Sequence, residues 1–243
     1  MQIQNSEKFD VLFQVAKENY SKEIGDLFNK FGNESDKKFI EKLAYYTQLV
    51  IKKTPPNFNH GFLLYYALSK YLSSITKKDS LFLLDIGTAR GFSSLVMSYV
   101  LQEKNFNAAI ISIDKISHTK KVKWNSILDG EFGISRKDIV ERFSESAKVI
   151  FLKGKSKKIL NDLNLPRVNF AFVDGDHRWG SLKSEIVYLM NNQKQGDVIL
   201  FDDYTPKIYP GVSKAVNFLK GAYSIEIFGD VSARGYALLT KIS

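Results

Sequence analysis

Two apolar runs in this sequence end on clusters of carboxylates, which are side chains that can bind a cation or move a proton. The segment FAFVDGDH (170–177) ends on two aspartates and a histidine, and VILFDDY (198–204) ends on two aspartates. Short continuous apolar runs are typical of strands that are buried on both faces. Because carboxylates held close together raise one another's pKa values, we expect a nearby hard cation or a proton-transfer role.

The elements that position these clusters form a regular alternation from residue 81 onward. Apolar runs alternate with helical stretches, which predicts a parallel sheet covered by helices on both faces. The last two runs are separated by a short turn and predict an antiparallel pair. We therefore expect an α/β fold with a doubly wound, mostly parallel, seven-stranded sheet. The predicted strands are 81–87, 108–115, 148–154, 168–176, 196–204, 223–230 and 235–243.

The first part of the chain has a different pattern and predicts helices only. Apolar residues recur at helical spacing over 7–31 and 39–50, and a further helix is expected after the break KTPPNFNHG (53–61). We divide the chain into an N-terminal helical cap, 1–76, and a second domain, 77–243. Aromatic residues of the cap are expected to be core rather than a binding pocket; they are Tyr45, Tyr46, Phe58, Phe62, Tyr65 and Tyr66.

Composition excludes several classes of protein. The 243 residues contain no cysteine, which rules out disulfides and zinc-thiolate sites. No apolar stretch is long enough to span a membrane, and the first residues do not resemble a signal peptide, so we expect a cytoplasmic protein. The net charge of +9 can attract nucleic acid or acidic small molecules, or it can reflect only a solvated, lysine-rich surface.

A glycine-containing turn follows the first predicted strand, in the segment LLDIGTARGFSS (83–94). It lacks the middle glycine of a dinucleotide-binding loop. The spacing of Asp85, Gly87 and Gly91 resembles motif one of the class I S-adenosylmethionine-dependent methyltransferases, which have a Rossmann-like fold. The resemblance implies that the glycines and Thr88 pass close to the cofactor and that Asp85 helps to hold the loop and the cofactor's amino group.

Other cofactor contacts are expected at the ends of neighbouring strands. Asp114 ends the second predicted strand, where a carboxylate can accept hydrogen bonds from both ribose hydroxyls. Ser156, in the segment after the third strand, is expected to border the adenine, and Asp174 is expected to border the cofactor from the fourth strand.

The two acidic segments strengthen the resemblance. DGDH followed by DDY is similar to the metal-dependent small-molecule O-methyltransferases of the macrocin and novobiocin type and to a broader methyltransferase group with the same motifs. The resemblance implies a Mg²⁺ site at Asp174, Asp202 and Asp203. It also implies that Asp176 is the general base, with His177 as the competing candidate. The chain departs from the macrocin type in having His177 and Arg178 directly after DGD.

The expected activity is S-adenosylmethionine-dependent O-methylation of a small molecule, such as a sugar or a natural product. Lysines in the long connection and after the third strand suggest an acidic acceptor or only a solvated cluster; they are Lys120, Lys121, Lys123, Lys153 and Lys155. The alternatives are a nucleic-acid methyltransferase, which the absence of a recognisable RNA-binding module disfavours, and a noncatalytic nucleoside-binding module. The extra N-terminal helices suggest packing between subunits of a homo-oligomer.

Overall fold

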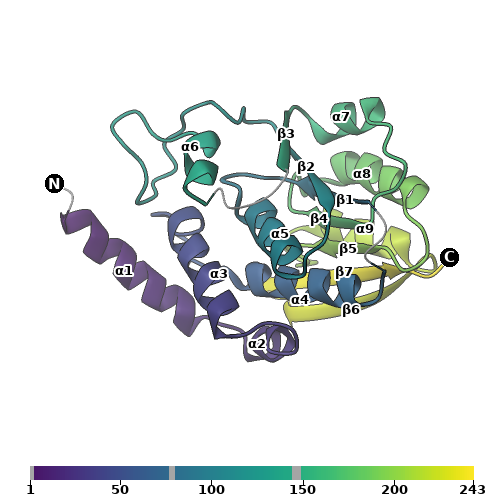
Figure 1. The fold of residues 1–243 in the computed structure, drawn as a ribbon, viewed down its shortest axis with the longest axis horizontal. Helices are drawn as coiled ribbons and strands as arrows, with labels where there is room; N and C mark the ends of the chain where they lie inside the picture. Colours follow the sequence, from purple (N-terminus) through teal and green to yellow (C-terminus); the bar gives the residue numbers. More distant parts are fainter. Residues whose placement is uncertain (1–2, 77–79, 144–148) are drawn as a thin grey trace.

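A mixed seven-stranded sheet forms the centre of the protein in this computed structural model, which describes residues 3–76, 80–143 and 149–243 (Figure 1). The strand order is β3-β2-β1-β4-β5-β7-β6, with β7 antiparallel to both of its neighbours. The predicted doubly wound sheet and its antiparallel pair are confirmed. The strands are β1 (Leu81–Ile86), β2 (Ala108–Asp114), β3 (Val149–Lys153), β4 (Phe170–Val173), β5 (Val198–Phe201), β6 (Tyr223–Asp230) and β7 (Arg234–Lys241).

Helices cover both faces of this sheet. On one face, α4 and α5 pack on the side chains of Leu83, Phe172 and Leu200, while the alternate residues Leu84 and Ala171 face the helices of the other layer. This alternation follows from the twofold period of a strand and explains why β4 and β5 are apolar at every residue. The helices of the sheet region are α4 (Asn59–Ser73), α5 (Phe92–Glu103), α6 (Arg136–Val140), α7 (Ser156–Asp162), α8 (Trp179–Asn192) and α9 (Pro210–Leu219).

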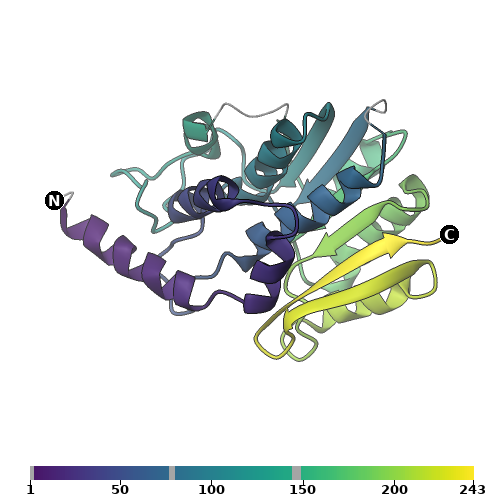
Figure 2. The ribbon, with the colours of Figure 1, turned by 60° about the horizontal axis from the view of Figure 1, so that its bottom comes forward.

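The N-terminal segment is helical, as predicted, but its first periodic stretch is two helices. They are α1 (Ile3–Glu18) and α2 (Lys22–Phe28), followed by α3 (Glu34–Thr47). The break occurs because Ser21 caps α2, with its hydroxyl accepting a hydrogen bond from the Ile24 amide at 3.4 Å. Figure 2 shows α2 close to the β6–β7 hairpin at one edge of the sheet, where the Glu23 carboxylate accepts a hydrogen bond from the Gly229 amide.

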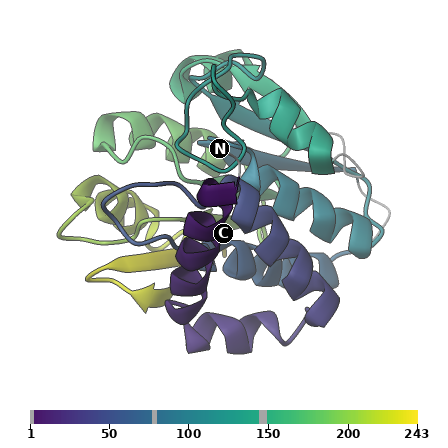
Figure 3. The ribbon, with the colours of Figure 1, turned by 90° about the vertical axis from the view of Figure 1, so that its left-hand side faces the viewer.

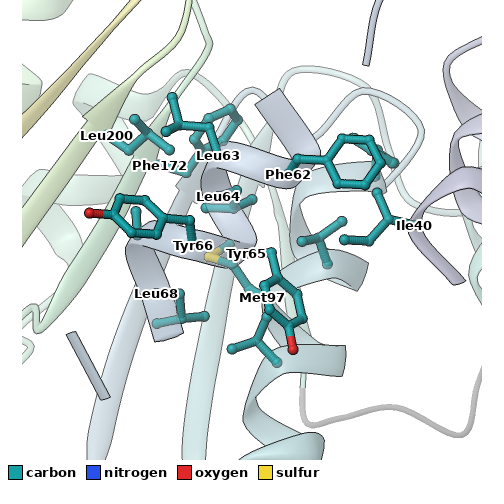
Figure 4. Packing of buried hydrophobic residues seen from close by; sticks show 14 of the residues in the cluster. Ile40, Phe62, Leu63, Leu64, Tyr65, Tyr66, Leu68, Met97, Phe172 and Leu200 are labelled. Atoms are coloured by element: carbon teal, nitrogen blue, oxygen red, sulfur yellow. The ribbon is translucent and has the colours of Figure 1, made fainter. Parts of the chain in front are cut away.

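Helix α4 ties the N-terminal helices to the sheet. Thirteen of its fifteen residues are buried, and Figure 4 shows Phe62, Leu63 and Tyr65 packed among side chains of α3, α5 and the sheet. The aromatic residues Phe58, Phe62, Tyr65 and Tyr66 therefore belong to the core, as expected. The division of the chain at residue 76 remains a prediction. One apolar core contains residues from both sides of this position. Residues 77 and 148, where the second domain and the third strand were expected to begin, lie outside the described residues.

The loop between α3 and α4 reaches the edge of the sheet that carries the site. Figure 3 shows this loop extending toward the connection after β5. Lys52 and residues 54–57 of the loop line a cavity together with Asp203 and with Tyr209 of that connection. In the described part of the chain, no helix is long and apolar enough to cross a membrane.

Candidate functional site

The turn after β1 brings the chain backbone against the end of β4. Gly87 has a φ of +98°, and a Cβ atom there would lie 2.0 Å from the carbonyl oxygen of Asp174. Only glycine fits this close approach. Gly91, with a φ of +97°, begins α5. The Thr88 hydroxyl lies 2.5 Å from that of Ser112 and is almost fully buried, so the side chain of Thr88 faces the protein interior.

Asp85 lies below this turn and is fully buried. Its carboxylate accepts hydrogen bonds from the hydroxyls of Ser93, Ser94 and Ser112. Burial raises the pKa of Asp85, and these hydroxyls partly offset the effect. Asp85 thereby joins β1, β2 and the first turn of α5. Its contact with a cofactor amino group remains a prediction.

Asp114 at the end of β2 faces the same turn. Its carboxylate accepts hydrogen bonds from the amides of Ala89 at 2.8 Å and Ile116 at 2.6 Å. Arg136 of α6, which is 2% exposed, donates to the Ala89 carbonyl at 2.6 Å and lies 3.4 Å from Asp114. Hydrogen bonds therefore hold both the amide and the carbonyl group of Ala89 in this turn. Arg136 was not predicted from the sequence, because it lies 47 residues after Ala89.

A cavity of about 500 Å³ opens between the ends of β1, β2, β3 and β4. This is the point where the strand order reverses, and ligands of doubly wound sheets bind at such a point. Ser156, the first residue of α7, lines the cavity and donates a hydrogen bond to the buried Glu185. The lining residues are Ile86, Gly87, Ala89, Ile113, Asp114, Lys115, Gly154, Ser156, Asp174, Gly175, Asp176, His177 and Arg178.

Asp174, His177 and Asp203 form a cluster beside this cavity. Their ligand atoms lie within 4.8 Å of one another. Nε2 of His177 lies 3.7 Å from Asp174 Oδ1 and 3.4 Å from Asp203 Oδ2, without hydrogen-bond geometry to either. The His177 backbone is fixed by α9, because a Cβ atom on Gly211 would lie 2.1 Å from the His177 carbonyl oxygen. Two carboxylates and an imidazole are a donor set that suits several divalent cations.

The charges of this cluster are not balanced by its own members. Burial and the neighbouring Asp202 raise the pKa of Asp174 to about 7, and the same two causes raise the pKa of Asp203. Proximity to Asp174 and Asp203 raises the pKa of His177 against the effect of its partial burial. A bound cation would relieve the repulsion between these carboxylates.

Asp202 has a different environment from the one expected of a metal ligand. Its buried carboxylate accepts hydrogen bonds from Arg234 Nη2 at 2.7 Å and from the Asp203 amide at 2.7 Å. Burial would raise the pKa of Asp202, but Arg234 and His60 outweigh burial and lower it. The predicted set of Asp174, Asp202 and Asp203 is therefore not the set whose ligand atoms cluster. In the described structure, His177 completes the cluster instead.

Asp176 is held by cations. Arg178 donates to both of its oxygens, at distances down to 2.5 Å, and Ser181 donates to Oδ2 at 3.0 Å. The Arg178 contacts hold the pKa of Asp176 well below its usual range, which makes this carboxylate a weak base. The choice of base remains a prediction, and the geometry favours His177 over Asp176.

A second, larger cavity of about 890 Å³ lies on the other side of the cluster. Asp203 lines this cavity, whereas Asp174 and His177 line the smaller one. None of the five lysines singled out in the sequence lines either cavity. His60 does not line them either; it is buried between Phe92 and Phe172, and burial lowers its pKa to about 4. The wall of the larger cavity is formed by Asn19, Ser21, Glu23, Ile24, Lys52, Thr54, Pro55, Pro56, Asn57, Asn59, Asp203, Ile208, Tyr209, Gly229, Asp230, Ala233, Arg234 and Tyr236.

Comparison with known proteins places this geometry in a known fold. Residues 84–204 match the family model described as a methyltransferase domain. The uncharacterized protein R132 of Acanthamoeba polyphaga mimivirus is 25% identical over 202 residues, which cover 77% of this chain and 83% of R132.

Solved methyltransferase structures share the fold at low sequence identity. A candidate O-methyltransferase from Klebsiella pneumoniae superposes with a TM-score of 0.61 at 13% identity, over 93% of this chain and 99% of its own. The O-methyltransferase NovP superposes with a TM-score of 0.60 at 14% identity, over 86% of this chain and 100% of its own. The O-methyltransferase TomG from Streptomyces achromogenes, in complex with SAM, has a TM-score of 0.57 at 14% identity, over 87% of this chain and 91% of its own. Residues 84–204 therefore match a methyltransferase domain, within a chain that has the Rossmann-like fold of solved methyltransferases.

Proposed function

We propose that this protein transfers the methyl group of S-adenosylmethionine to a hydroxyl oxygen of a small molecule, with the help of a divalent cation. The observation that carries this proposal is the position of the cluster between two cavities. Asp174 and His177 line the smaller cavity, and Asp203 lines the larger one. Chemistry between a cofactor and an acceptor requires such a junction, because the two reacting atoms must approach each other there.

The smaller cavity suits the cofactor. The backbone of Gly87 and Ala89 lines one wall, and Asp114 presents a carboxylate at the position where ribose hydroxyls bind in related folds. Ser156 at the start of α7 would border the adenine. The cofactor's reactive methyl group would then point toward Asp174 and the larger cavity, where the acceptor binds.

The residues at the cluster fit a divalent cation. Asp174 and Asp203 supply oxygen ligands whose pKa values are raised by burial and by the neighbouring charge of Asp202, and a cation would favour their charged forms. Such a cation would supply Lewis acidity, which lowers the pKa of a nearby hydroxyl group. Arg234 keeps Asp202 charged and orients it behind the cluster, with its oxygen bonded to the Asp203 amide.

His177 is the base in this proposal. Its Nε2 atom is buried and has no hydrogen-bond partner among the described residues, so it can take the proton of the acceptor hydroxyl. The acceptor oxygen attacks the methyl carbon in line with the sulfur, and the C–S bond breaks with its electron pair passing to sulfur. The products are a methyl ether, S-adenosylhomocysteine and a proton on His177.

One assay tests the proposal. Radiolabelled methyl transfer from S-adenosylmethionine is measured over a library of hydroxylated small molecules, with Mg²⁺ or with excess chelator. We expect transfer that requires the cation and is lost in Asp203→Asn. Full activity in chelator would remove the cation from the mechanism, and transfer only to RNA or DNA would replace the acceptor class.

A second variant separates the two roles that His177 can play, because one nitrogen cannot hold a cation and accept a proton at once. His177→Asn should retain cation binding and lose methyl transfer. If the variant loses the cation together with activity, His177 is a ligand and the proposed base is wrong.

A further inference from the structure

The larger cavity contains acidic and basic side chains that differ in how well they are paired. Glu23 accepts a hydrogen bond from the Gly229 amide at 3.0 Å. Asp230 accepts from the amide and the hydroxyl of Ser232, at 2.8 and 2.6 Å. These two carboxylates therefore already have partners within the protein, and they do not need a basic ligand.

Lys52 lines the same cavity without such a partner. Within the described ranges, its ammonium has no carboxylate within 4 Å and no hydrogen bond. Burial and the nearby positive charges of Arg234 and Arg90 lower its pKa, and Asp203 and Asp174 only partly oppose this. Lys52 is therefore an exposed residue on the wall of the cavity, within electrostatic reach of Asp203 and Asp174.

Arg90 adds a second cation that lacks a full set of partners. It is 7% exposed, belongs to the turn between Gly87 and Gly91, and lines neither cavity. Its guanidinium lies 5.9 Å from the Trp124 ring, and its Nη1 atom is buried without a hydrogen-bond partner in the part of the chain that the structure describes. Burial lowers the pKa of Arg90 to about 10, so the group keeps its charge at neutral pH.

The basic residues on the wall of the larger cavity differ in whether they are already paired. Arg234 donates to the Asp202 carboxylate at 2.7 Å, so its charge is matched within the protein. Lys52 has no such partner among the described residues and lines the cavity together with Asp203. An anionic group of a ligand in this cavity can therefore pair with Lys52.

We propose that the acceptor carries an anionic group, a carboxylate or a phosphate, which binds Lys52 with additional attraction from Arg90. This inference rests on the proposed function and names the class of its acceptor. The amides and hydroxyls of the wall, such as Asn57, Thr54 and Tyr209, suit a polar, hydroxylated body for the same molecule. The lysines singled out in the sequence do not contribute, because they lie outside both cavities.

Isothermal titration calorimetry of the full chain, saturated with S-adenosylhomocysteine and Mg²⁺, tests this with three probes. They are D-glucuronate, D-glucose 6-phosphate and neutral D-glucose. We expect the anionic probes to bind and glucose to bind much more weakly, and the preferred anion identifies carboxylate or phosphate. Added salt should weaken the binding. Equal affinity for glucose, or no binding of either anion, would overturn the inference.

Variants of two neighbouring lysines sharpen the test. Lys52→Met should weaken binding of the preferred anion by about tenfold, as expected for one charged hydrogen bond, whereas Lys52→Arg should restore it. Lys53→Met removes an equal charge beside the cavity and should change little. A probe held only by the cation would bind Lys52→Met as tightly as the original chain, and that result would also overturn the inference.

The first titration step separates this inference from the proposed function. If S-adenosylhomocysteine itself does not bind, the proposed function fails. If S-adenosylhomocysteine binds and the anions do not, only the anionic acceptor is wrong.

Discussion

Asp202 and Asp203 are adjacent in the chain but have different surroundings. Asp202 directly follows β5 and is buried, and its carboxylate accepts a hydrogen bond from Arg234 of β7. Asp203 has a φ of +55°, a left-handed backbone that aspartate tolerates better than most residues. Its carboxylate lies near His177 and lines the larger cavity. One residue of the pair therefore stabilises the site, and the other is available to a ligand.

The ion pair of Arg234 with the buried Asp202 predicts a large loss of stability when the arginine is removed. Arg234→Met should lower the free energy of unfolding by about 3–5 kcal/mol, because it leaves the charge of Asp202 buried without its partner. Urea denaturation measures this change. The matched control is Arg178→Met, which removes an arginine of comparable geometry from the exposed pair with Asp176. That variant should lose at most about 1 kcal/mol. Equal losses in the two variants would contradict the assignment of Asp202 to a buried ion pair.

Glu185 predicts a dependence of stability on pH. Burial raises its pKa from 4.5 to about 7. In the unfolded chain the group loses its proton near the lower value, whereas the folded protein keeps the proton until the higher one. Above the lower value the unfolded state therefore binds fewer protons, and the free energy of unfolding falls as the pH rises through this window.

Glu185→Gln should remove this contribution. Between about pH 5 and about pH 8, the original chain should lose about 2–3 kcal/mol more stability than the variant. Urea denaturation at the two pH values gives the difference in slope, which is independent of any constant cost of the substitution. Parallel pH profiles in the two proteins would show that Glu185 ionises normally.

The sequence predicted those residues of the site that end strands. Asp114, Asp174 and Asp203 each follow an apolar run, and the carboxyl ends of parallel strands meet at one edge of the sheet. Arg234 could not be predicted in this way, because it lies 32 residues after Asp202 and reaches it only through the antiparallel pairing of β7. The ion pair of Asp176 with Arg178 was not predicted, although the two residues are only two positions apart.

At the scale of elements, the long connection between β2 and β3 has a specific task. Its short helix α6 begins with a capping box at Ser135 and Asp138, which fixes the direction of the first turn. This places Arg136 against Ala89 and Asp114. The connection therefore helps to hold the turn after β1, in which Ala89 has a φ of +44°.

Arg136→Met should weaken binding of S-adenosylhomocysteine by about 10-fold to 100-fold, because the charged hydrogen bond to the Ala89 carbonyl and the ion pair with Asp114 are lost. Calorimetric titration measures the affinity, and Arg136→Lys should recover part of it. Arg142→Met, a change in the exposed short helix at Glu141–Phe143, serves as the control and should bind normally. If Arg136→Met binds the ligand as tightly as the original chain, the turn does not depend on this clamp.

The hydrophobic period predicted whether each long element is a helix or a strand. It did not predict where a helix is interrupted. The helical pattern over 7–31 gave no weight to Ser21, whose capping hydrogen bond starts a new helix. Helix α7 was not expected, because its seven residues, SKKILND, offer too few apolar positions for a clear period. Its position beside the smaller cavity follows from the pairing of β3 with β2, which is a long-range property.

At the scale of the whole molecule, the buried helix α4 joins the N-terminal helices and the sheet in one core. Tyr71 of α4 donates to Asp197 at 3.2 Å, and Asn169 donates to Tyr71 at 3.0 Å, so polar contacts cross the same boundary. We therefore expect one cooperative unfolding transition, with calorimetric and van't Hoff enthalpies that agree. Two separate transitions by scanning calorimetry would show that the helical segment is an independent domain.

The central claim is that Asp174 and Asp203 hold a divalent cation beside the cofactor. Electron paramagnetic resonance with Mn²⁺, added to the chain saturated with S-adenosylhomocysteine, tests it without knowledge of the acceptor. We predict one tightly bound ion in the original chain, an affinity at least about tenfold weaker in Asp203→Asn, and no change in Asp230→Asn, whose carboxylate lines the same cavity away from the cluster. The absence of a tight site in the original chain, or equal affinity in Asp203→Asn, would contradict the claim.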